Sequence, residues 1–283
     1  MPPGSAYRPP SHRIGSVEGM TLDADLLTFA TQLAREAGEL ARVRRAAGVS
    51  LAATKSTLAD IVTEADREVE ALIRSRIEAE RPDDGFLGEE TGADVGTSGL
   101  TWIIDPIDGT VNYAYGIPAY AISIAVVEGD PNTPGWTPRV GVVFNPAIGE
   151  LFHATIGGGA FLGDRQLFVN QEIGEAGSLI ATGFGYAAER RAEQFAVLER
   201  VLPLARDIRR IGAASLDLAS VAAGRVDAYY ERGIWPWDYA AGSLLVTEAG
   251  GLVGGLGGLP ASGDLLIAAA PELYAKLERA LQG

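Results

Sequence analysis

The first part of the chain repeats its apolar residues with the period of an α-helix. Between residues 22 and 46 they recur every three or four positions, which places them on one face of a helix. Thr21 stands just before this segment as a candidate N-cap. The predicted buried face consists of Leu26, Leu27, Ala30, Leu33, Ala34, Ala37 and Leu40.

A second helix is predicted over residues 64–80. Thr63 and Asp66 have a spacing similar to that of a capping box at its start. Pro82 ends the helix, since proline has no N–H group to donate. The apolar face consists of Val69, Leu72, Ile73 and Ile77.

Short apolar runs bounded by turn residues follow the second helix and predict strands. They lie at residues 86–88, 101–105, 121–127, 140–144 and 151–155. This pattern is typical of helices packed on an antiparallel sheet.

From residue 179 onward the predicted strands and helices alternate, which favours an α/β layer structure. The strands lie at 179–182, 207–211, 226–231 and 265–269. The helices lie at 192–205, 214–223, 237–249 and 271–281. The Gly-rich stretch 250–263 is interpreted as a turn between strands.

Together these patterns predict an α/β (α+β) fold in which helices and sheets form a layered sandwich. We divide the chain into three parts. Residues 1–20 are expected to be a flexible N-terminal tail, residues 21–170 an α+β half, and residues 171–283 an α/β half. The candidate functional residues described below fall in both halves, so we expect a site between them.

Composition and charge narrow the possible partners and compartment. The net charge of −14 disfavours nucleic acid, which basic surfaces bind. No apolar run approaches the ~20 residues that span a bilayer, and the N-terminus has no apolar signal-peptide core. Without cysteine there is no disulfide, thiolate zinc site or cysteine nucleophile. We therefore expect a cytoplasmic protein with neither nucleic acid nor membrane as a partner.

The stretch from Trp102 to Tyr113 is the richest in candidate chemistry. An apolar run is expected to end as a strand at Asp105, because Pro106 forbids continued pairing. One turn later Asp108 returns towards Asp105, and two such carboxylates repel each other unless a cation lies between them. Mg²⁺ prefers oxygen ligands of this kind together with a substrate phosphate.

Gly109 and Thr110 follow directly and add the features of an anion site. Gly109 lets the backbone approach a ligand, and Thr110 is a candidate cap of a helix whose N-terminus attracts an anion. Metal carboxylates beside such a site predict metal-assisted phosphate chemistry.

Other acidic residues have two interpretations each. Glu89 and Glu90 follow a short predicted strand and suit a solvated turn. Asp66 and Asp238 suit the first turn of a helix, where negative charge is favourable, and Glu231 suits a strand end. The other interpretation is that several of these acids converge on metal ions, and the two interpretations stay open at the level of single residues.

Several other chemistries are disfavoured. Only two histidines occur, His12 and His153, so a Ser-His-Asp triad or a histidine-rich zinc site is not expected. The sequence contains no P-loop pattern and no EF-hand loop. The pair Asp23 and Asp25 is placed at a helix start rather than after an apolar strand, which argues against an aspartyl-phosphate nucleophile.

Three segments taken together resemble the inositol monophosphatase family of Mg²⁺-dependent phosphatases. They are Gly-Glu-Glu at 88–90, DPIDGTVNY at 105–113 and WDYAAG at 237–242. The resemblance runs from about Leu26 to Leu277 and includes Lys55-Ser56, ATGFGY at 181–186 and the segment 209–233. Val111 and Tyr113 depart from the more usual threonine and phenylalanine.

The resemblance implies a five-layer αβαβα fold, a homodimer and two or three Mg²⁺ ions in each active site. Glu89, Asp105 and the carbonyl oxygen of Ile107 would hold the first ion. Asp105, Asp108 and Asp238 would hold the second, and a weaker third ion would contact Glu89.

The same resemblance assigns the remaining roles. Asp66 and Thr110 would orient the attacking water, and Glu89 would also be a catalytic residue. The backbone of Gly109 and Thr110 would bind the phosphate, and Asp108 would also be a substrate-binding residue. Ala214 and Glu231 would face the hydroxyl groups of inositol. The implied activity is a lithium-sensitive hydrolysis of myo-inositol monophosphate.

Alternatives remain within and outside this activity. A phosphatase of the same superfamily would act on histidinol phosphate, fructose 1,6-bisphosphate, NADP or adenosine 3′,5′-bisphosphate. A protein of another class would use the same fold for regulatory binding. The complete set of acidic residues favours the enzyme.

Overall fold

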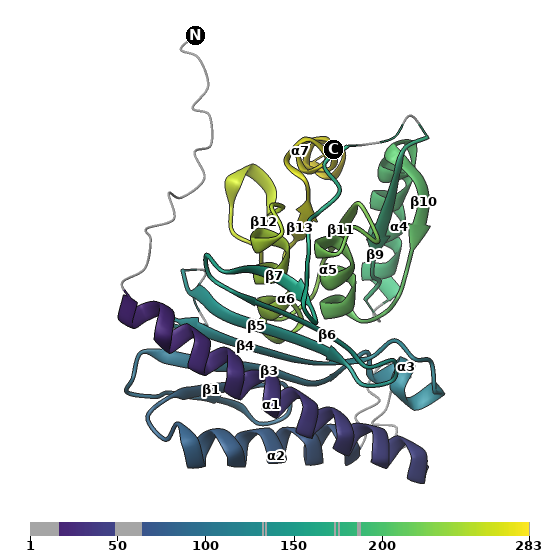
Figure 1. The fold of residues 1–283 in the computed structure, drawn as a ribbon. Helices are drawn as coiled ribbons and strands as arrows, with labels where there is room; N and C mark the ends of the chain where they lie inside the picture. The colour runs from purple at the N-terminus through teal and green to yellow at the C-terminus, as the bar shows by residue number, and fades with distance from the viewer. Residues whose placement is uncertain are drawn as a thin grey trace.

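The computed structural model describes residues 17–48, 64–131, 133, 135–172, 174, 176–185 and 188–282. Figure 1 shows that helices and sheets alternate in five layers, which is the predicted layered sandwich. The expectations for Lys55, Ser56, Thr63 and Tyr186 lie outside the described residues.

Two antiparallel helices, α1 (Val17–Ala47) and α2 (Glu64–Glu80), form the first layer. The second layer is an eight-stranded sheet with the order β2-β1-β3-β4-β5-β6-β7-β8. Only the pairing of β1 with β3 is parallel in it. Its strands are β1 (Gly85–Gly88), β2 (Gly92–Asp94), β3 (Leu100–Asp108), β4 (Ala121–Glu128), β5 (Thr137–Asn145), β6 (Glu150–Thr155), β7 (Gly159–Leu162) and β8 (Arg165–Gln166).

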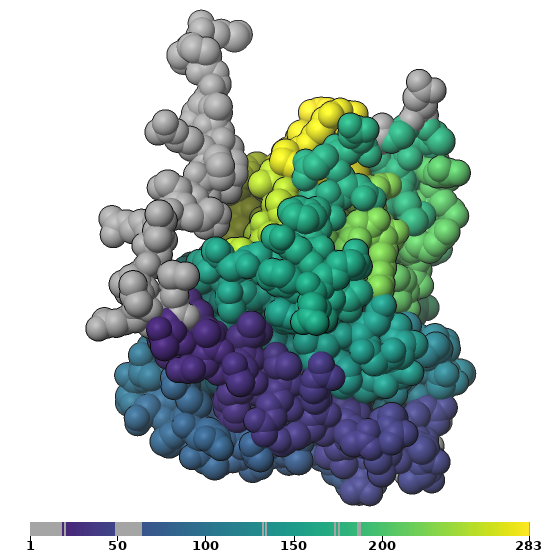
Figure 2. Space-filling model, viewed as in Figure 1, coloured from purple at the N-terminus to yellow at the C-terminus, as the bar shows by residue number. Residues whose placement is uncertain are grey.

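The remaining three layers come mainly from the second half of the chain. Helices α5 (Ala214–Ala222) and α6 (Pro236–Glu248) lie between the two sheets. The second sheet has the order β10-β9-β11-β13-β12, and α4 (Ala188–Val201) and α7 (Pro271–Gln282) cover its outer face. Its strands are β9 (Ser178–Thr182), β10 (Ala205–Arg209), β11 (Ala228–Glu231), β12 (Leu252–Gly254) and β13 (Leu266–Ala269). In the space-filling view, α1 and α2 and the C-terminal elements lie at opposite ends of the molecule (Figure 2).

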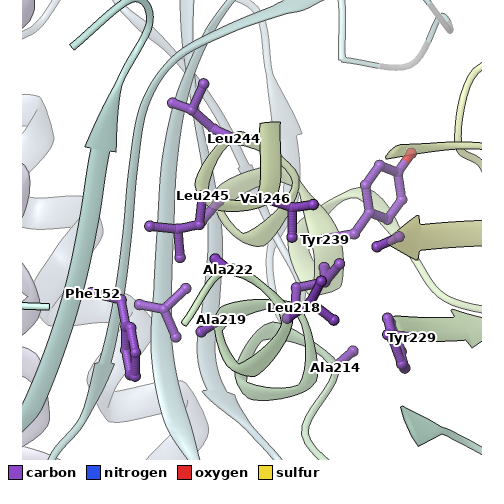
Figure 3. Close-up of a cluster of buried hydrophobic side chains, with 14 of the residues drawn as sticks. Phe152, Ala214, Leu218, Ala219, Ala222, Tyr229, Tyr239, Leu244, Leu245 and Val246 are labelled. Carbon is purple, nitrogen blue, oxygen red and sulfur yellow. The ribbon is translucent and has the colours of Figure 1, made fainter. Parts of the chain in front are cut away.

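Alternation along β3 divides the core between the two faces of the first sheet. Trp102 and Ile104 pack against α1 and α2, whereas Ile103 between them belongs to the central core. The central core surrounds α5 and α6 and takes residues from both halves of the chain, including Phe152 and Leu245 (Figure 3). The division at residue 170 therefore runs through a shared core, and its status as a domain boundary stays a prediction.

Close packing of α5 on α6 depends on a small residue. A Cβ atom at Gly242 would overlap the side chain of Leu218 on α5. The Ala-rich faces of both helices fill the rest of the contact. This packing fixes the start of α5 relative to the start of α6, and both starts border the candidate site.

The first helix begins earlier than predicted. α1 starts at Val17, so Thr21 lies inside the helix instead of capping it, and the helix includes the last residues of the expected tail. Asp23 is buried and forms an ion pair with Arg139 at 3.0 Å between Nε and Oδ1. This tertiary contact accounts for an acidic residue that the sequence alone places in a first helical turn.

Strand β3 does not end at Asp105 as predicted. It continues to Asp108, which pairs with Ala121 on β4 after a register shift between Asp105 and Asp108. A bulge leaves residues outside the hydrogen-bonded ladder, so Pro106 is accommodated without a missing donor. The bulge also displaces the peptide units between the two aspartates.

Other differences involve short elements and proline. Helix α4 ends at Val201, whereas the prediction extended it to Ala205 through Pro203, which lies in a 3-10 turn (Leu202–Leu204). The stretch 250–263 contains β12 and a second 3-10 turn (Leu256–Gly258). The strands β2, β7 and β8 are further elements that the sequence analysis missed. Within the described residues, none of the helices is both long and apolar enough to span a membrane.

Candidate active site

All the predicted site residues line one cavity of about 490 Å³. The cavity lies where β1, β3 and β11 end and where α2, α3 (Thr110–Tyr115), α5 and α6 begin. The structure thus brings together residues far apart in the sequence. The residues are Asp66, Glu89, Asp105, Ile107, Asp108, Gly109, Thr110, Ala214, Glu231 and Asp238. Their functional roles stay predictions.

Three carboxylates form the centre of the cavity. Asp105, Asp108 and Asp238 each offer an oxygen atom, and these atoms lie within 4.8 Å of one another. Asp105 and Asp108 are almost completely buried. Burial raises the pKa of Asp105 well above its usual range, and repulsion from Glu89, Asp108 and Asp238 raises it further. Three hard oxygen ligands without a neutralising side chain among them fit a divalent cation.

The bulge of β3 orients Asp105. The N–H group of Ile107 donates a hydrogen bond to Oδ1 of Asp105 at 3.1 Å. The carbonyl oxygen of Ile107, a predicted metal ligand, accepts a hydrogen bond from Oγ1 of Thr110 at 3.2 Å. The local backbone therefore holds two predicted ligands next to each other.

Asp108 is fixed by the start of α5. Its Oδ2 accepts hydrogen bonds from the N–H of Ser215 at 2.7 Å and from Oγ of Ser215 at 2.5 Å. The N–H of Ala214 donates to Oδ1 at 3.2 Å. Burial still raises the pKa of Asp108, although these hydrogen bonds oppose the shift. Asp108 thus satisfies free N–H groups of a helix start while it faces the cavity.

Asp238 occupies the same kind of position on α6. Pro236 is in the first turn, where its missing N–H costs nothing, and the N–H of Trp235 donates to Oδ2 of Asp238 at 2.5 Å. Burial raises the pKa of Asp238 well above its usual range, and repulsion from Asp108 adds to the rise. Asp238 is therefore both an acid in the first turn of a helix and a residue that lines the cavity, so the two interpretations from the sequence do not exclude each other.

Glu89 lies at the mouth of the cavity, where its side chain contacts solvent although protein atoms enclose it on most sides. This enclosure raises the pKa of Glu89 to about 8, with further repulsion from Asp66, Glu90 and Asp108. A hydrogen bond with Asp105 acts in the opposite direction.

A buried carboxylate that the sequence analysis missed holds the turn after Glu89. Oε2 and Oε1 of Glu70 accept hydrogen bonds from the N–H groups of Glu90 at 2.9 Å and Thr91 at 2.8 Å. Gly88 leaves room for this carboxylate, because a Cβ atom there would lie 2.5 Å from it. Glu70 therefore positions Glu89 from the second helix.

Asp66 and Thr110 meet at the start of α3. Asp66 lies in the first turn of α2 as predicted and is buried, with its Oδ1 accepting from Oγ1 of Thr110 at 3.4 Å. Thr110 does not cap α3, because Gly109 occupies the N-cap with a φ of 89°. The threonine hydroxyl is committed to Asp66 and Ile107 instead. Glycine suits this left-handed conformation, which a side chain rarely adopts.

Glu231 and Ala214 also line the cavity. Oε2 of Glu231 accepts a hydrogen bond from the hydroxyl of Tyr229 at 2.6 Å. Burial raises the pKa of Glu231 to about 7, while Tyr229 and Arg210 oppose the shift. Gly183 leaves space for the carboxylate, since a Cβ atom there would overlap it.

Positive charge and aromatic rings also line the cavity, and the sequence analysis did not assign them to it. They are Arg190, Arg210, Arg232, Phe184, Trp235 and Trp237. The sequence did contain a sign of Trp235 and Trp237, because two tryptophans beside an aspartate such as Asp238 are unusual at a protein surface. It contained no sign of the arginines, since an isolated arginine in a helix or loop is ordinary.

Comparison with known structures places the chain in a class of layered α/β proteins. The model of the inositol monophosphatase family matches residues 23–282, so the chain belongs to that family. The chain is 43% identical to an inositol-1-monophosphatase of Mycobacterium bovis, with 92% of this chain and 94% of the relative covered.

Two further relatives show the range of names in the family. A Nus factor SuhB of Pasteurella multocida is 39% identical, with 91% of this chain and 96% of the relative covered. The structure of an inositol monophosphatase from Anabaena (Nostoc) is 34% identical with a TM-score of 0.77, and 92% and 96% of the two chains are covered. The five-layer fold predicted from the resemblance is thereby confirmed.

Proposed function

We propose that the protein is a Mg²⁺-dependent phosphomonoesterase that hydrolyses myo-inositol monophosphate to inositol and phosphate. The observation that supports this most strongly is the cluster of Asp105, Asp108 and Asp238, of which the first two are buried, with Glu89 beside it. Carboxylates with raised pKa values at the centre of a cavity favour a bound cation. The family membership supports phosphate chemistry at this cluster.

The chain's own groups fit a magnesium site. Glu89, Asp105, Asp108, Asp238 and the carbonyl oxygen of Ile107 are hard oxygen ligands. Among the described residues that line the cavity there is no cysteine or histidine. Bound divalent ions would supply positive charge to the phosphate oxygens and lower the pKa of a coordinated water.

Protein groups around that site would orient the reactants. Asp66 and Thr110 are hydrogen-bonded to each other and line the same cavity, which supports the proposal that they would orient the attacking water. The backbone of Gly109 and Thr110 faces the cavity and would donate to phosphate oxygens. Arg190 and Arg210 would attract the anionic end of the substrate.

Glu231 would select the alcohol. Its carboxylate lines the same cavity as the acidic cluster and accepts a hydrogen bond from the hydroxyl of Tyr229, which fixes its orientation. Such a carboxylate can accept hydrogen bonds from the hydroxyl groups of a neutral ring, with Ala214 leaving space beside it. Glu231 disfavours a second phosphate near it, so the monophosphate is the expected substrate.

Several wider properties belong to the same proposal. We expect a cytoplasmic homodimer that uses two or three Mg²⁺ ions in each active site. Li⁺ at elevated concentration should inhibit by competing for the site of Asp105, Asp108 and Asp238. Insensitivity to Li⁺ would count against the inositol phosphate assignment but would leave the family membership intact.

The substrate assignment is tested by phosphate release in the presence of Mg²⁺. The panel consists of myo-inositol 1-phosphate, histidinol phosphate, fructose 1,6-bisphosphate, NADP and adenosine 3′,5′-bisphosphate. We expect the highest kcat/KM with myo-inositol 1-phosphate. A higher kcat/KM with another compound of the panel would assign that compound as the substrate instead.

A second candidate is a regulatory binding protein, which the similarity to the Pasteurella multocida Nus factor favours. The presence of the complete acidic cluster argues for the enzyme, because regulatory binding alone does not require it. Absence of phosphate release from every substrate, in protein shown to bind Mg²⁺, would support the regulatory candidate over the enzyme.

A further inference from the structure

Gly183 lies beside Glu231 where β9 and β11 reach the cavity. The two strands are parallel, and Thr182 pairs with Tyr230 at the end of their ladder. Gly183 and Glu231 each follow one position later, and both line the cavity. The three atoms nearest to a Cβ atom added at Gly183 all belong to the carboxyl group of Glu231, and the Cβ would overlap them. The carboxylate of Glu231 therefore occupies the volume that a side chain at position 183 would fill.

The backbone conformation of Gly183 gives no reason for a glycine. Its φ lies outside the left-handed region, in which glycine is favoured over residues with a side chain. The overlap of an added Cβ atom involves the end of one side chain and none of the neighbouring backbone. The missing side chain at position 183 thus serves the placement of Glu231 and not the course of the chain.

Helix α4 holds the backbone on the far side of Gly183. Oε1 of the buried Gln194 accepts a hydrogen bond from the N–H group of Gly185 at 2.8 Å. Nε2 of Gln194 donates a longer hydrogen bond to the carbonyl oxygen of Gly183 at 3.5 Å. On the near side, Thr182 is held in the ladder with β11. Because the backbone is anchored on both sides, a side chain at position 183 would displace Glu231 and leave the backbone in place.

Displacement of Glu231 would also break its contact with Tyr229. The hydroxyl of Tyr229 donates to Oε2 of Glu231 at 2.6 Å, and the ring of Tyr229 is completely buried in the central core. A ring in a close-packed core cannot follow a carboxylate that moves away. The orientation of Glu231 therefore depends on the hydroxyl of Tyr229 and on the space at Gly183 together.

We propose that Gly183 determines the selectivity of the site for a polyol, because it leaves the space in which Glu231 faces the ring hydroxyls of the substrate. Gly183 is a positioning residue that acts through Glu231. This inference rests on the proposed function, in which Glu231 binds the hydroxyl groups of the alcohol. It adds that a position between β9 and α4, without a functional group of its own, sets which alcohol the site accepts.

The first test compares Gly183→Ala with the wild type on two substrates in Mg²⁺. For myo-inositol 1-phosphate, kcat/KM should fall about tenfold or more, since hydrogen bonds to a charged group are lost. The loss should lie mainly in KM, because the ring hydroxyls are bound in the ground state as well as in the transition state. For 4-nitrophenyl phosphate, which has no ring hydroxyls, kcat/KM should change by less than about twofold.

A double-mutant cycle separates this role from a general effect on the loop. In the Glu231→Ala background the added Cβ atom has room, so Gly183→Ala should change kcat/KM for myo-inositol 1-phosphate by less than about twofold. Gly185→Ala is the matched control, since its Cβ atom would meet the side chain of Arg190 instead. It should change both substrates by the same factor. Equal losses on both substrates in Gly183→Ala, or the same loss with and without Glu231, would overturn the proposal.

A crystal structure of Gly183→Ala beside the wild type gives a readout that does not depend on turnover. The carboxylate of Glu231 should be turned away from the hydroxyl of Tyr229, with the backbone of residues 182–185 unmoved. A shifted backbone with Glu231 still bound to Tyr229 would overturn the inference. If the wild type releases no phosphate from inositol 1-phosphate, the proposed function fails, and this structure still decides whether Gly183 positions Glu231. If the wild type is active and Gly183→Ala keeps its selectivity, the inference fails alone.

Discussion

At the scale of single residues, the site is a collection of charges that oppose one another. Asp105, Asp108 and Asp238 are held close together by hydrogen bonds from the backbone, and among the described residues no lysine or arginine forms an ion pair with them. The fold thus keeps an arrangement that is unfavourable by itself. Such strain at a cavity is typical of a site completed by a ligand.

Glu231 gives the first prediction at this scale. Glu231→Gln keeps the size of the side chain but removes the charge that we propose accepts hydrogen bonds from inositol hydroxyls. Hydrogen bonds to charged groups are worth roughly 1.5–3 kcal/mol, so kcat/KM for myo-inositol 1-phosphate should fall about ten- to a hundredfold. The assay belongs above pH 8, where Glu231 is ionised because burial raises its pKa only to about 7.

A simple aryl phosphate without ring hydroxyls is the control substrate for this variant. Its hydrolysis should fall much less, since it cannot use the hydrogen bonds of Glu231. If both substrates lose equally, Glu231 acts on the structure or on the cations, and its role in selecting the alcohol is wrong.

At the scale of elements, helix starts and one bulge build the site. The β3 bulge sets Asp105 and Asp108 apart along the strand, and α5 and α6 each begin at one of the three carboxylates. The free N–H groups of a helix start favour a negative charge and so keep the carboxylates in place. The same elements therefore provide stability and candidate chemistry.

Ser215 tests the contact between α5 and β3. Ser215 is completely buried, and Ser215→Ala removes the hydrogen bond from its hydroxyl to Asp108. The free energy of unfolding should fall by about 1–3 kcal/mol, measured by urea denaturation. The activity should fall as well, because Asp108 becomes less well oriented.

Ser243→Ala on α6 is the matched control. The Ser243 hydroxyl is buried without a hydrogen-bond partner among the described residues, so its removal should change stability by less than about 0.5 kcal/mol. Equal destabilisation by the two substitutions would show that the Ser215 contact with Asp108 is not the source of the effect.

Elements whose hydrophobic pattern repeats over many residues were predictable from the sequence, whereas short and irregular elements were not. The strong apolar face of α2 gave its bounds, since Glu64–Glu80 is the predicted range. β8 (Arg165–Gln166) is too short for any alternation to appear. The bulge after Asp105 depends on pairing with β4, which local sequence does not show. Thr110 failed as a cap because Asp66, distant in sequence, binds its hydroxyl.

At the scale of the molecule, the site is assembled from both halves of the chain. Spacing along the sequence could suggest that Asp105 and Asp108 are close, because one turn separates them. It could not show that Asp238 lies within 4.8 Å of both, and only the family resemblance brought it in. Glu70 was missed because the N–H groups that it binds follow another element, and Arg190 because an isolated arginine in a helix gives no sequence signal.

The raised pKa values predict a pH dependence of the whole protein. Burial raises the pKa of Glu89 from 4.5 to about 8 and that of Glu231 from 4.5 to about 7. Between these values the folded protein binds more protons than the unfolded chain does. The contribution of these two groups to the stability of the metal-free protein is therefore fully present below about pH 4.5. It is lost as the pH rises towards 8.

Thermal unfolding in EDTA should accordingly give a lower Tm at pH 8 than at pH 5.5. Mg²⁺ should raise the Tm more at pH 8, since the cation favours the ionised carboxylates. A metal-free Tm that increases over this range, or a Mg²⁺ effect that is the same at both pH values, would contradict the repulsion we describe.

The central claim is that the carboxylate cluster holds the cations that make this protein a phosphatase. Phosphate release from myo-inositol 1-phosphate, titrated with Mg²⁺ in the wild type and in Asp105→Asn, tests it most directly. We expect Asp105→Asn to lose activity by roughly a hundred- to a thousandfold or more, because it removes charge without volume. Its metal-free Tm should equal or exceed that of the wild type, since one buried repulsive charge is gone.

The exposed Asp25→Asn on α1 is the control and should keep full activity. Wild-type activity of Asp105→Asn at limiting Mg²⁺ would contradict the account.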